Sequence, residues 1–226
     1  NGIPKNFSIS GILEGYHTWD VMCYDVFGNN QTAGTTNFTI DLTSPIVYLY
    51  APTPGQLFGY NDIEFNWSAI DNLDPDLSCD ITIDSTIRAS NVSTINNTNA
   101  STIITVVNGF HYWNVTCDDN RVKMHFSDIR NFTVSAPPLP ILMSPQNYTG
   151  GFTTTNGTFT YNATHDASID NCSLYIDGSY NQANDSILLN GLNYFYVDTL
   201  SSGNHTWQVK CENPSGIGNS STWVFW

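Results

Sequence analysis

The chain has 226 residues and carries 20 acidic against 6 basic residues, which gives a formal charge of -14 and a pI near 4.2. So few lysines and arginines cannot neutralise a phosphate backbone or an anionic lipid surface, which excludes nucleic-acid and membrane-surface binding. The hydrophobic share of 40% is enough for a packed core. No apolar run approaches the roughly 18 residues that a membrane-spanning helix needs.

An eleven-residue motif recurs at a fixed spacing of 94 residues along the chain. It reads GYHTWDVMCYD from Gly15, GFHYWNVTCDD from Gly109 and GNHTWQVKCEN from Gly203. A fixed period of this length predicts tandem domains. We therefore expect the last three strands of a module in residues 1–43 and complete modules in residues 44–136 and 137–226.

Hydrophobic and polar residues alternate along short runs of each repeat, as at Ile63, Phe65 and Trp67. A period of two is typical of half-buried strands, and no convincing helical stripe appears. The expected fold class is all-β, with tandem antiparallel β-sandwiches of which the N-terminal one is incomplete. In the second repeat we expect strands near residues 46–51, 62–70, 78–84, 101–107, 110–118 and 127–134.

Four of the five cysteines form two equivalent pairs in the second and third repeats. Cys79 and Cys117 lie 38 residues apart, and Cys172 and Cys211 lie 39 residues apart. We expect each pair to form a disulfide that joins the third strand of its module to the sixth. Buried free thiols are the alternative, and zinc is disfavoured because there is no C-x-x-C pair.

The fifth cysteine, Cys23, is expected to be unpaired within the chain, because the repeat spacing places its partner before residue 1. Three strands that expose Trp19, Val21 and Cys23 could not stand alone with that face in water. We expect the missing strands from an upstream part of the same polypeptide. Strands from another chain, by self-association of neighbouring copies or from a different partner, are the alternative.

The triplet N-x-S/T, with x other than proline, occurs sixteen times, against roughly five or six expected by random placement. This excess predicts an N-glycosylated extracellular protein whose surface is solvated by sugar rather than by charge. Accidental triplets in a chain rich in Asn and Thr are the alternative. The candidate glycosylation sites are Asn6, Asn30, Asn37, Asn66, Asn91, Asn96, Asn99, Asn114, Asn131, Asn147, Asn156, Asn162, Asn171, Asn184, Asn204 and Asn219.

The motif G-x-H-x-W-x-V-x-C-x-D, the turn Asp25-Val-Phe-Gly-Asn and the linker Asp41-Leu-Thr-Ser-Pro resemble tandem immunoglobulin-like modules. They look most like the modules of large secreted archaeal and bacterial cell-surface glycoproteins, and the resemblance covers essentially the whole chain. It implies stalks, surface layers, adhesins or filaments rather than one function. The first cysteine comes on the strand after the aromatic F-x-W/Y motif, unlike in antibody domains, so antigen binding is not implied.

The acidic residues of the second repeat form one candidate metal site. The loops after its second and sixth strands should share the end of the sandwich at which the chain enters. Oxygen ligands gathered there would suit Ca²⁺, and solvated loop carboxylates are the alternative. The candidate ligands are Asp41, Asp71, Asp74, Asp76, Asp118 and Asp119. The matching end of the third repeat offers only His165, Asp166, Asp170 and Glu212.

No catalytic residues are expected. His17, His111 and His205 occupy one repeat position, which favours packing or hydrogen bonding, and neither His125 nor His165 belongs to a recognisable triad. Apart from calcium and covalent N-glycans, no cofactor is expected. The sequence thus predicts a non-catalytic structural glycoprotein of the cell surface, a repeating segment of an extracellular filament, stalk or surface layer. An adhesin or carbohydrate-binding module, with an unglycosylated patch of clustered aromatic residues, is the alternative.

Overall fold

The computed structural model describes residues 3–119, 123–150, 152, 155–166 and 168–226. Two compact units are formed, one by Asn1–Ala51, Asn66–Thr102 and Trp113–Ile129, the other by Pro52–Phe65, Ile103–Tyr112 and Arg130–Trp226. The module boundaries expected from the sequence remain predictions, since this division follows compactness rather than sequence periodicity. The described residues form β-strands and connecting loops, in agreement with the expected all-β class.

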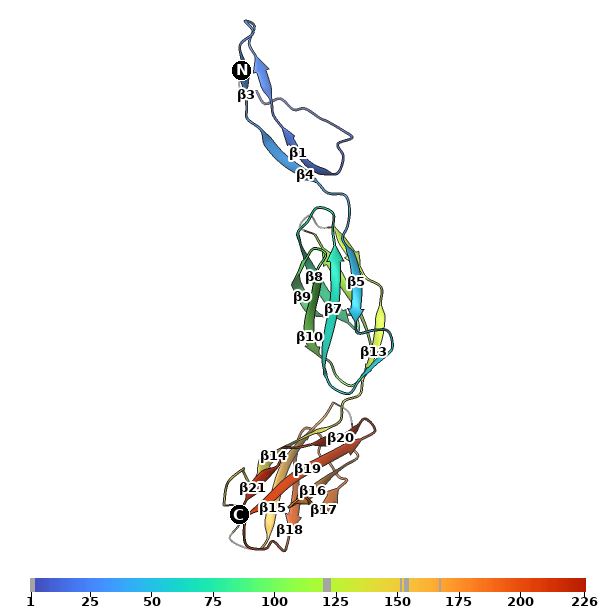
Figure 1. Ribbon diagram of the computed structural model, residues 1–226, viewed down its shortest axis with the longest axis vertical. Helices are drawn as coiled ribbons and strands as arrows, with labels where there is room; N and C mark the ends of the chain where they lie inside the picture. The colour runs from blue at the N-terminus through green and yellow to red at the C-terminus, as the bar shows by residue number, and fades with distance from the viewer. Residues whose placement is uncertain (1–2, 120–122, 151, 153–154, 167) are drawn as a thin grey trace. The chain divides into compact units, whose positions relative to one another are not determined.

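Residues 15–40, in the first unit, form two short antiparallel ladders (Figure 1). The first pairs β1 (Gly15–Trp19) with β4 (Thr36–Ile40), and the second pairs β2 (Met22–Tyr24) with β3 (Asn30–Thr32). The turn between β2 and β3 is closed by Asp25, whose Oδ1 accepts hydrogen bonds of 2.9 Å from the backbone N–H groups of Phe27 and Asn29. Such an aspartate-centred turn explains the local sequence Asp-Val-Phe-Gly-Asn.

The second repeat contains two sheets, with strand orders β10-β7-β5 and β6-β13-β11-β8-β9, and β12 pairs with β11. All six expected strands are present, and β6, β9 and β12 are additional. The strands are β5 (Ile46–Ala51), β6 (Gln56–Phe58), β7 (Asp62–Ile70), β8 (Asp76–Ile83), β9 (Thr86–Ile95), β10 (Asn99–Thr105), β11 (Gly109–Asp118), β12 (Met124–Phe126) and β13 (Arg130–Val134).

Buried side chains from the two sheets of the second repeat contact each other, and examples occur in each compact unit. In the first unit, Trp67 of β7 donates its Nε1–H to Thr94 Oγ1 of β9 over 3.1 Å. In the second unit, the Phe65 ring of β7 meets the edge of Phe132 of β13, with centroids 5.6 Å apart. These side chains belong to the alternating set that the sequence places inward, and their burial produces a two-layer sandwich.

The third repeat, in the second unit, has the sheets β14-β15-β18 and β17-β16-β19-β20, and β21 pairs with β19. Its core includes Phe159, Tyr161, Trp207 and Phe225, all buried. The strands are β14 (Leu139–Ser144), β15 (Gly157–Thr164), β16 (Asn171–Ile176), β17 (Ser179–Asn184), β18 (Leu192–Val197), β19 (His205–Asn213), β20 (Gly216–Asn219) and β21 (Trp223–Phe225).

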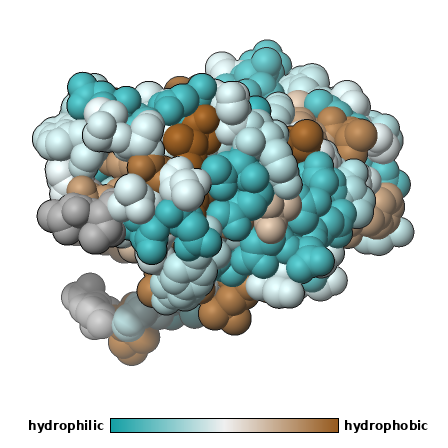
Figure 2. Space-filling view, turned by 90° about the horizontal axis from the view of Figure 1, so that it is seen from below, coloured by the Kyte–Doolittle hydropathy of each residue, from teal (hydrophilic) through white to brown (hydrophobic). Residues whose placement is uncertain are grey.

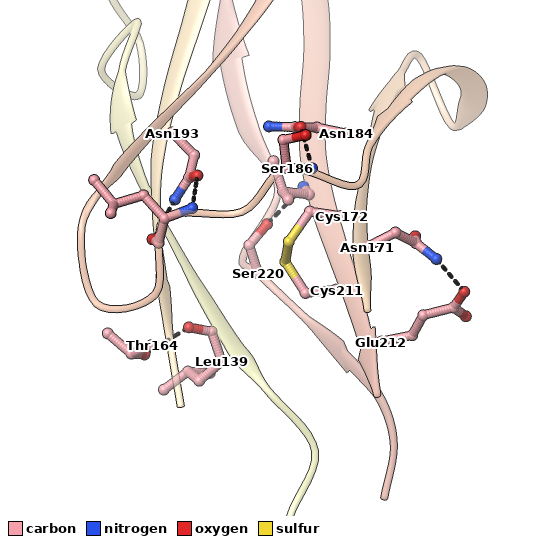
Figure 3. Close-up of a disulfide and its surroundings, with 12 residues drawn as sticks. Leu139, Thr164, Asn171, Cys172, Asn184, Ser186, Asn193, Cys211, Glu212 and Ser220 are labelled. Atoms are coloured by element: carbon pink, nitrogen blue, oxygen red, sulfur yellow. Dashed lines mark hydrogen bonds between the residues drawn. A yellow bond between two sulfur atoms is a disulfide. The ribbon is translucent and has the colours of Figure 1, made fainter. Parts of the chain in front are cut away.

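Both expected disulfides are formed, Cys79–Cys117 and Cys172–Cys211, and all four cysteines are fully buried. In each pair the cysteines are direct partners on neighbouring antiparallel strands, β8 with β11 and β16 with β19. Figure 3 shows the second disulfide, with the hydrogen bond from Asn171 to Glu212 on the same two strands. Each disulfide therefore lies within one sheet and does not join the two layers.

Candidate functional site

The repeated histidine is a structural element in all three repeats. Its Nε2 lies within hydrogen-bond distance of the carbonyl oxygen four residues earlier: 2.7 Å for His17, 2.9 Å for His111 and 3.0 Å for His205. Each imidazole also contacts one phenylalanine ring, at centroid distances of 5.3–5.4 Å. The glycine two residues earlier has φ between +133° and +146° in each repeat, a conformation that favours glycine. The G-x-H motif is thus explained by local backbone geometry.

In the third repeat this histidine also lies between a serine and an aspartate. Nδ1 of His205 is 2.7 Å from Asp177 Oδ2, and Nε2 is 3.2 Å from Ser201 Oγ. A catalytic triad requires Nε2 to accept the serine proton. Here, as in the other two repeats, Nε2 faces a backbone carbonyl oxygen, to which it can only donate. In this arrangement Nε2 of His205 donates to the Ser201 carbonyl and does not act as a base for its hydroxyl, and the imidazole, when protonated, forms a hydrogen-bonded ion pair with Asp177.

The His205–Asp177 pair predicts a pH-dependent contribution to stability. The hydrogen bond to Asp177 raises the pKa of His205, and the hydrogen bond from His205 lowers the pKa of Asp177 against the opposing effect of partial burial. The histidine contribution is present below its unfolded pKa of about 6.5 and is lost as pH rises through its folded pKa. The aspartate contribution is present above about pH 3.9 and is lost as pH falls through its folded pKa.

We expect Asp177→Asn to cost about 0.5–1 kcal/mol near pH 5.5 and almost nothing at pH 8.5, because the half-exposed pair is screened by water. Asparagine keeps the left-handed conformation of this residue, φ 52°, accessible. Urea unfolding at the two pH values measures the difference. Equal losses at both would show that the ion pair contributes nothing.

The sixteen candidate glycosylation asparagines all lie in the described part of the chain, and each is exposed or half-buried. Those on strands project from the face opposite the buried aromatic and cysteine residues, as the alternation predicts. The face seen in Figure 2 is mainly hydrophilic, and its apolar residues form small separate groups. None of the sixteen residues is buried as a whole, although the side-chain oxygens of Asn66 and Asn162 are enclosed; whether these asparagines carry glycans remains a prediction.

Asn96 differs from the other candidate sites because its side-chain amide is fully engaged. Its Nδ2 donates to the carbonyl oxygens of Asp71 (2.6 Å) and Asp74 (2.8 Å), and its Oδ1 accepts from the N–H of Asp71 (3.1 Å). These three bonds fix the loop between β7 and β8. The N-x-S/T pattern gives no indication of this role.

The N-terminal strand pair, by which we mean the ladders β1–β4 and β2–β3, exposes residues whose counterparts in the second and third repeats are buried. Trp19 is 52% exposed, whereas Trp113 and Trp207 at the same repeat position are each 1% exposed. Cys23 is free and exposed, whereas its counterparts form the two disulfides. In the complete repeats the strand carrying the counterpart of Trp19 pairs with β8 or β16. Among the described residues, no strand occupies the corresponding edge of β1 or β2.

Three of the six predicted metal ligands are brought together in the first unit. Asp41 follows β4, Asp74 lies between β7 and β8, and Asp119 follows β11. All three are buried, and one carboxylate oxygen from each lies within 4.8 Å of the others. Segments separated by more than 30 residues therefore place three carboxylates at one point.

The surrounding residues hold Asp41 in this position. Glu14 accepts hydrogen bonds from the N–H groups of Leu42 (2.9 Å) and Thr43 (3.0 Å). The hydrogen bond from the Leu42 N–H, followed by one from the Asn72 side chain, lowers the pKa of Glu14 to about 2. Burial raises the pKa of Asp41 against a hydrogen bond from the Thr43 N–H, and the side-chain hydrogen bond with Glu14 adds to the increase, followed by the charges of Asp71 and Asp119. Asp41 therefore lies in an acidic environment.

Asp71 is next to Asp74 in this loop but is not one of the three clustered aspartates, Asp41, Asp74 and Asp119. It is 7% exposed, and its Oδ1 accepts from the N–H groups of Leu73 (2.8 Å) and Asp74 (2.9 Å). Its Oδ2 is enclosed and has no hydrogen-bond partner in the described structure. The other two predicted ligands are elsewhere: Asp76 is exposed at the start of β8, and Asp118 is half-buried at the end of β11.

At the equivalent position of the third repeat, in the second unit, two asparagines and a histidine stand where the first unit has acids, and the carboxylate of Asp166 lies beside them. Advancing by 94 residues replaces Glu14 with Asn108, Asp71 with His165 and Asp119 with Asn213. Nδ2 of Asn108 donates to Ala136 O over 2.8 Å, and Nε2 of His165 lies 3.0 Å from the same oxygen. Nδ2 of Asn213 donates to Ser168 O over 3.3 Å. Sequence reasoning did not single out Glu14, Asn96 or Asn108 for these roles, which are recognisable only from their hydrogen bonds in the structure.

No known protein-family profile matches the chain, and comparison with curated proteins also finds no match. Among solved structures, it is similar to fibronectin(III)-like modules of Clostridium thermocellum CbhA, with 15% identity, coverage of 80% of this chain and 92% of that one, and a TM-score of 0.33. It is also similar to the Ig1-2 module of the Drosophila receptor protein tyrosine phosphatase DLAR, with 11% identity, coverage of 81% and 98%, and a TM-score of 0.31. Such values carry no functional argument.

No helix that is both long and apolar enough to cross a bilayer occurs in the described residues. The two disulfides are of a kind that forms and persists in oxidising compartments. The strand order of the two complete repeats and their alternating burial define the chain as an all-β protein of tandem immunoglobulin-like sandwiches.

Proposed function

We propose that this chain is a non-catalytic, N-glycosylated structural segment of an extracellular filament, stalk or surface layer at the cell surface. The observation that carries the proposal is the placement of all sixteen N-x-S/T asparagines at exposed or half-buried positions. With 6 basic residues the chain has few positive charges to hydrate its surface, and sugars would add to the hydration by its acidic, hydroxyl and amide side chains. Origin from archaeal or bacterial surface glycoproteins belongs to the same proposal.

The arrangement of the repeated elements supports a structural role. In the second and third repeats, the histidine, glycine, tryptophan and cysteine of the motif serve packing or backbone geometry, and each of these repeats has its own disulfide. The recurring residues thus maintain the fold of these two repeats. An adhesin or carbohydrate-binding module remains the second candidate, since Tyr112 and Tyr175 lie on outward strand faces, next to Phe110 and Tyr180.

A glycopeptide map of the protein purified from its native source tests the proposal. We expect glycans at most of the sixteen sites and around the whole surface, with Asn96 empty, because an N-glycosidic bond would replace one of its two donated hydrogens. Asn99, exposed three residues later, is the matched site expected to be occupied. A bare face bearing the exposed tyrosines would favour the adhesin, and a chain without any glycan would overturn the proposal.

The exposed face of the N-terminal strand pair is, on this proposal, covered by strands of the same module type. The register of the complete repeats specifies their chemistry: an antiparallel strand with a cysteine opposite Cys23 and apolar residues at alternate positions, as in Cys79-x-Ile81-x-Ile83. Such a strand comes from an upstream part of the polypeptide or from a neighbouring copy. The same digest, run without reductant, identifies the peptide bonded to Cys23. A free Cys23 in native material would show that no such strand is present.

A further inference from the structure

The outward residues that the structure describes on the sheet β14-β15-β18 include no Asp, Glu, Lys or Arg, in a chain whose formal charge is -14. The middle strand, β15, turns threonines and Asn162 outward, and apolar residues of β14 and β18 flank them on both sides. Continuous apolar surface on a soluble protein marks a place that another group covers. The flanking residues, each at least 45% exposed, are Leu139, Ile141, Met143, Leu192, Tyr194 and Tyr196.

Asn162, the first residue of an N-x-S/T triplet, lies in the middle of this face. The register pairs it directly with Ile141 on one side and with Leu192 on the other. Side chains at directly opposed positions have Cβ atoms about 5 Å apart, so both apolar side chains adjoin the asparagine. The side-chain oxygen of Asn162 is itself enclosed. A sugar attached to this side chain therefore starts close to the surface of the sheet.

Tyr194 and Thr164 complete the surroundings of Asn162 along the strand direction. Tyr194 pairs with Thr160, which places it at the diagonal position from Asn162, a separation of about 7–8 Å that an aromatic side chain can span. Thr164, the third residue of the triplet, donates its hydroxyl hydrogen to the carbonyl oxygen of Leu139 over 2.7 Å (Figure 3). This bond fixes β14 against β15 beside the asparagine, so the apolar surface is in place independently of any sugar.

The second repeat has a comparable arrangement on β7, the middle strand of its three-stranded sheet. Asn66 begins a triplet there, and the third residue, Ser68, pairs with Tyr48 and shares a hydrogen bond of 2.9 Å with the hydroxyl of Tyr50. Both tyrosines are nearly half exposed. The two triplets occupy different repeat positions, because Asn162 matches Ser68 at the spacing of 94 residues. A triplet beside large apolar or aromatic side chains therefore occurs twice without being one repeated residue.

A sugar ring carries hydroxyl groups on its rim and C–H groups on its two faces, so one face can cover apolar side chains while the rim stays hydrated. We propose, on the basis of the glycosylation proposed above, that the glycan of Asn162 packs its first sugars against Ile141, Leu192 and Tyr194. The glycan is then part of the fold of the third repeat and not only a hydrating group. A second copy of the chain is the competing occupant of this face, and a glycan on the middle strand keeps it away.

Thermal unfolding of the whole chain tests this proposal in two preparations, one from cells that attach its glycans and one made without glycosylation. We expect Asn162→Gln to lower the Tm of the glycosylated chain by about 4–8 °C, the shift that follows a moderate loss of stability in a domain the size of one repeat. The unglycosylated chain should lose less than half as much. Equal shifts in both preparations would assign the effect to the asparagine side chain and overturn the proposal. Thr164→Ala, which abolishes the triplet and keeps the asparagine, gives a second comparison of the same kind.

Asn219→Gln is the matched control, because Asn219 begins a triplet in the same repeat but is exposed on β20, where its cross-strand partner is Lys210. Its Tm should change little in either preparation. Equal losses for Asn162→Gln and Asn219→Gln in the glycosylated chain would show a general effect of glycans and refute the contact.

Replacing Ile141 and Leu192 together by threonine removes the apolar partners and keeps residues that favour strands. In this background Asn162→Gln should lower the Tm of the glycosylated chain by less than half of its effect in the wild-type chain, since contacting groups are not additive. An undiminished effect would refute the packing of sugar against these side chains.

Site occupancy separates this inference from the function on which it rests. The glycopeptide map is expected to show a glycan at Asn162. If Asn162 is empty while most other sites are occupied, the glycosylated structural segment stands and this inference fails, with the face left open to a second copy. If no site carries a glycan, both fail.

Discussion

Replacing both cysteines of the Cys79–Cys117 pair with alanine is expected to lower the free energy of unfolding by about 4 kcal/mol. The bond closes a segment of 38 residues, and a cross-link of that span restricts the unfolded chain by this amount on the loop-entropy estimate. The Cys172–Cys211 pair, with a separation of 39, should cost about as much. Urea unfolding followed by tryptophan fluorescence measures both, since Trp113 and Trp207 lie on the strands concerned.

Cys23→Ala is the control for this experiment. Cys23 is exposed and forms no disulfide within the chain, so its replacement should change stability by less than about 0.5 kcal/mol. A loss below about 1 kcal/mol for either disulfide would mean that the unfolded chain is already restricted in that region.

Gly218→Ala should cost about 3 kcal/mol. Gly218 lies on β20 as the partner of Cys211, and a Cβ at this position would be 1.5 Å from the carbonyl oxygen of Pro138. Because the obstacle is backbone, β20 and the residues preceding β14 must separate, and overpacking of this kind costs about 1–3 kcal/mol or more. Thermal unfolding of the variant should show the third repeat melting earlier.

Gly59→Ala is the matched substitution, because no atom lies within 4 Å of its added Cβ and its φ is not in the left-handed region. It should be neutral or slightly stabilising through the unfolded state. If Gly218→Ala behaved in the same way, the close approach of Pro138 would not exist in solution.

The elements that the sequence predicts well depend on periodicity. The 94-residue spacing, the inward positions of Phe65, Trp67 and Cys79, and both disulfides follow from side chains that alternate across a strand. The short edge strands β6 and β12 were not predicted, since three residues give too little pattern. Gly218 could not be recognised either: its counterpart opposite Cys117 is His125, so the repeat contains no glycine signal there.

The acidic cluster was only partly predictable. The alternation that buries Val115 and Cys117 continues to Asp119, which places Asp118 on the other face. The same rule applied to Leu77 and Cys79 turns Asp76 outward. Loop residues have no such rule: the burial of Asp74 depends on the hydrogen bonds from Asn96, which lies 22 residues further along the chain. Contacts between distant loops require the fold itself.

The length of chain that each disulfide closes has a mechanical consequence. When such a chain is pulled from both ends, tension crosses the covalent bridge, and the residues between Cys79 and Cys117 bear no load. This sequence separation of 38 would otherwise add about 130 Å of extended length in a repeat of 94 residues. An oxidised repeat unfolded by force therefore stops at roughly three-fifths of its full extension. The redox state of its surroundings thus sets how far the chain lengthens under load before it breaks.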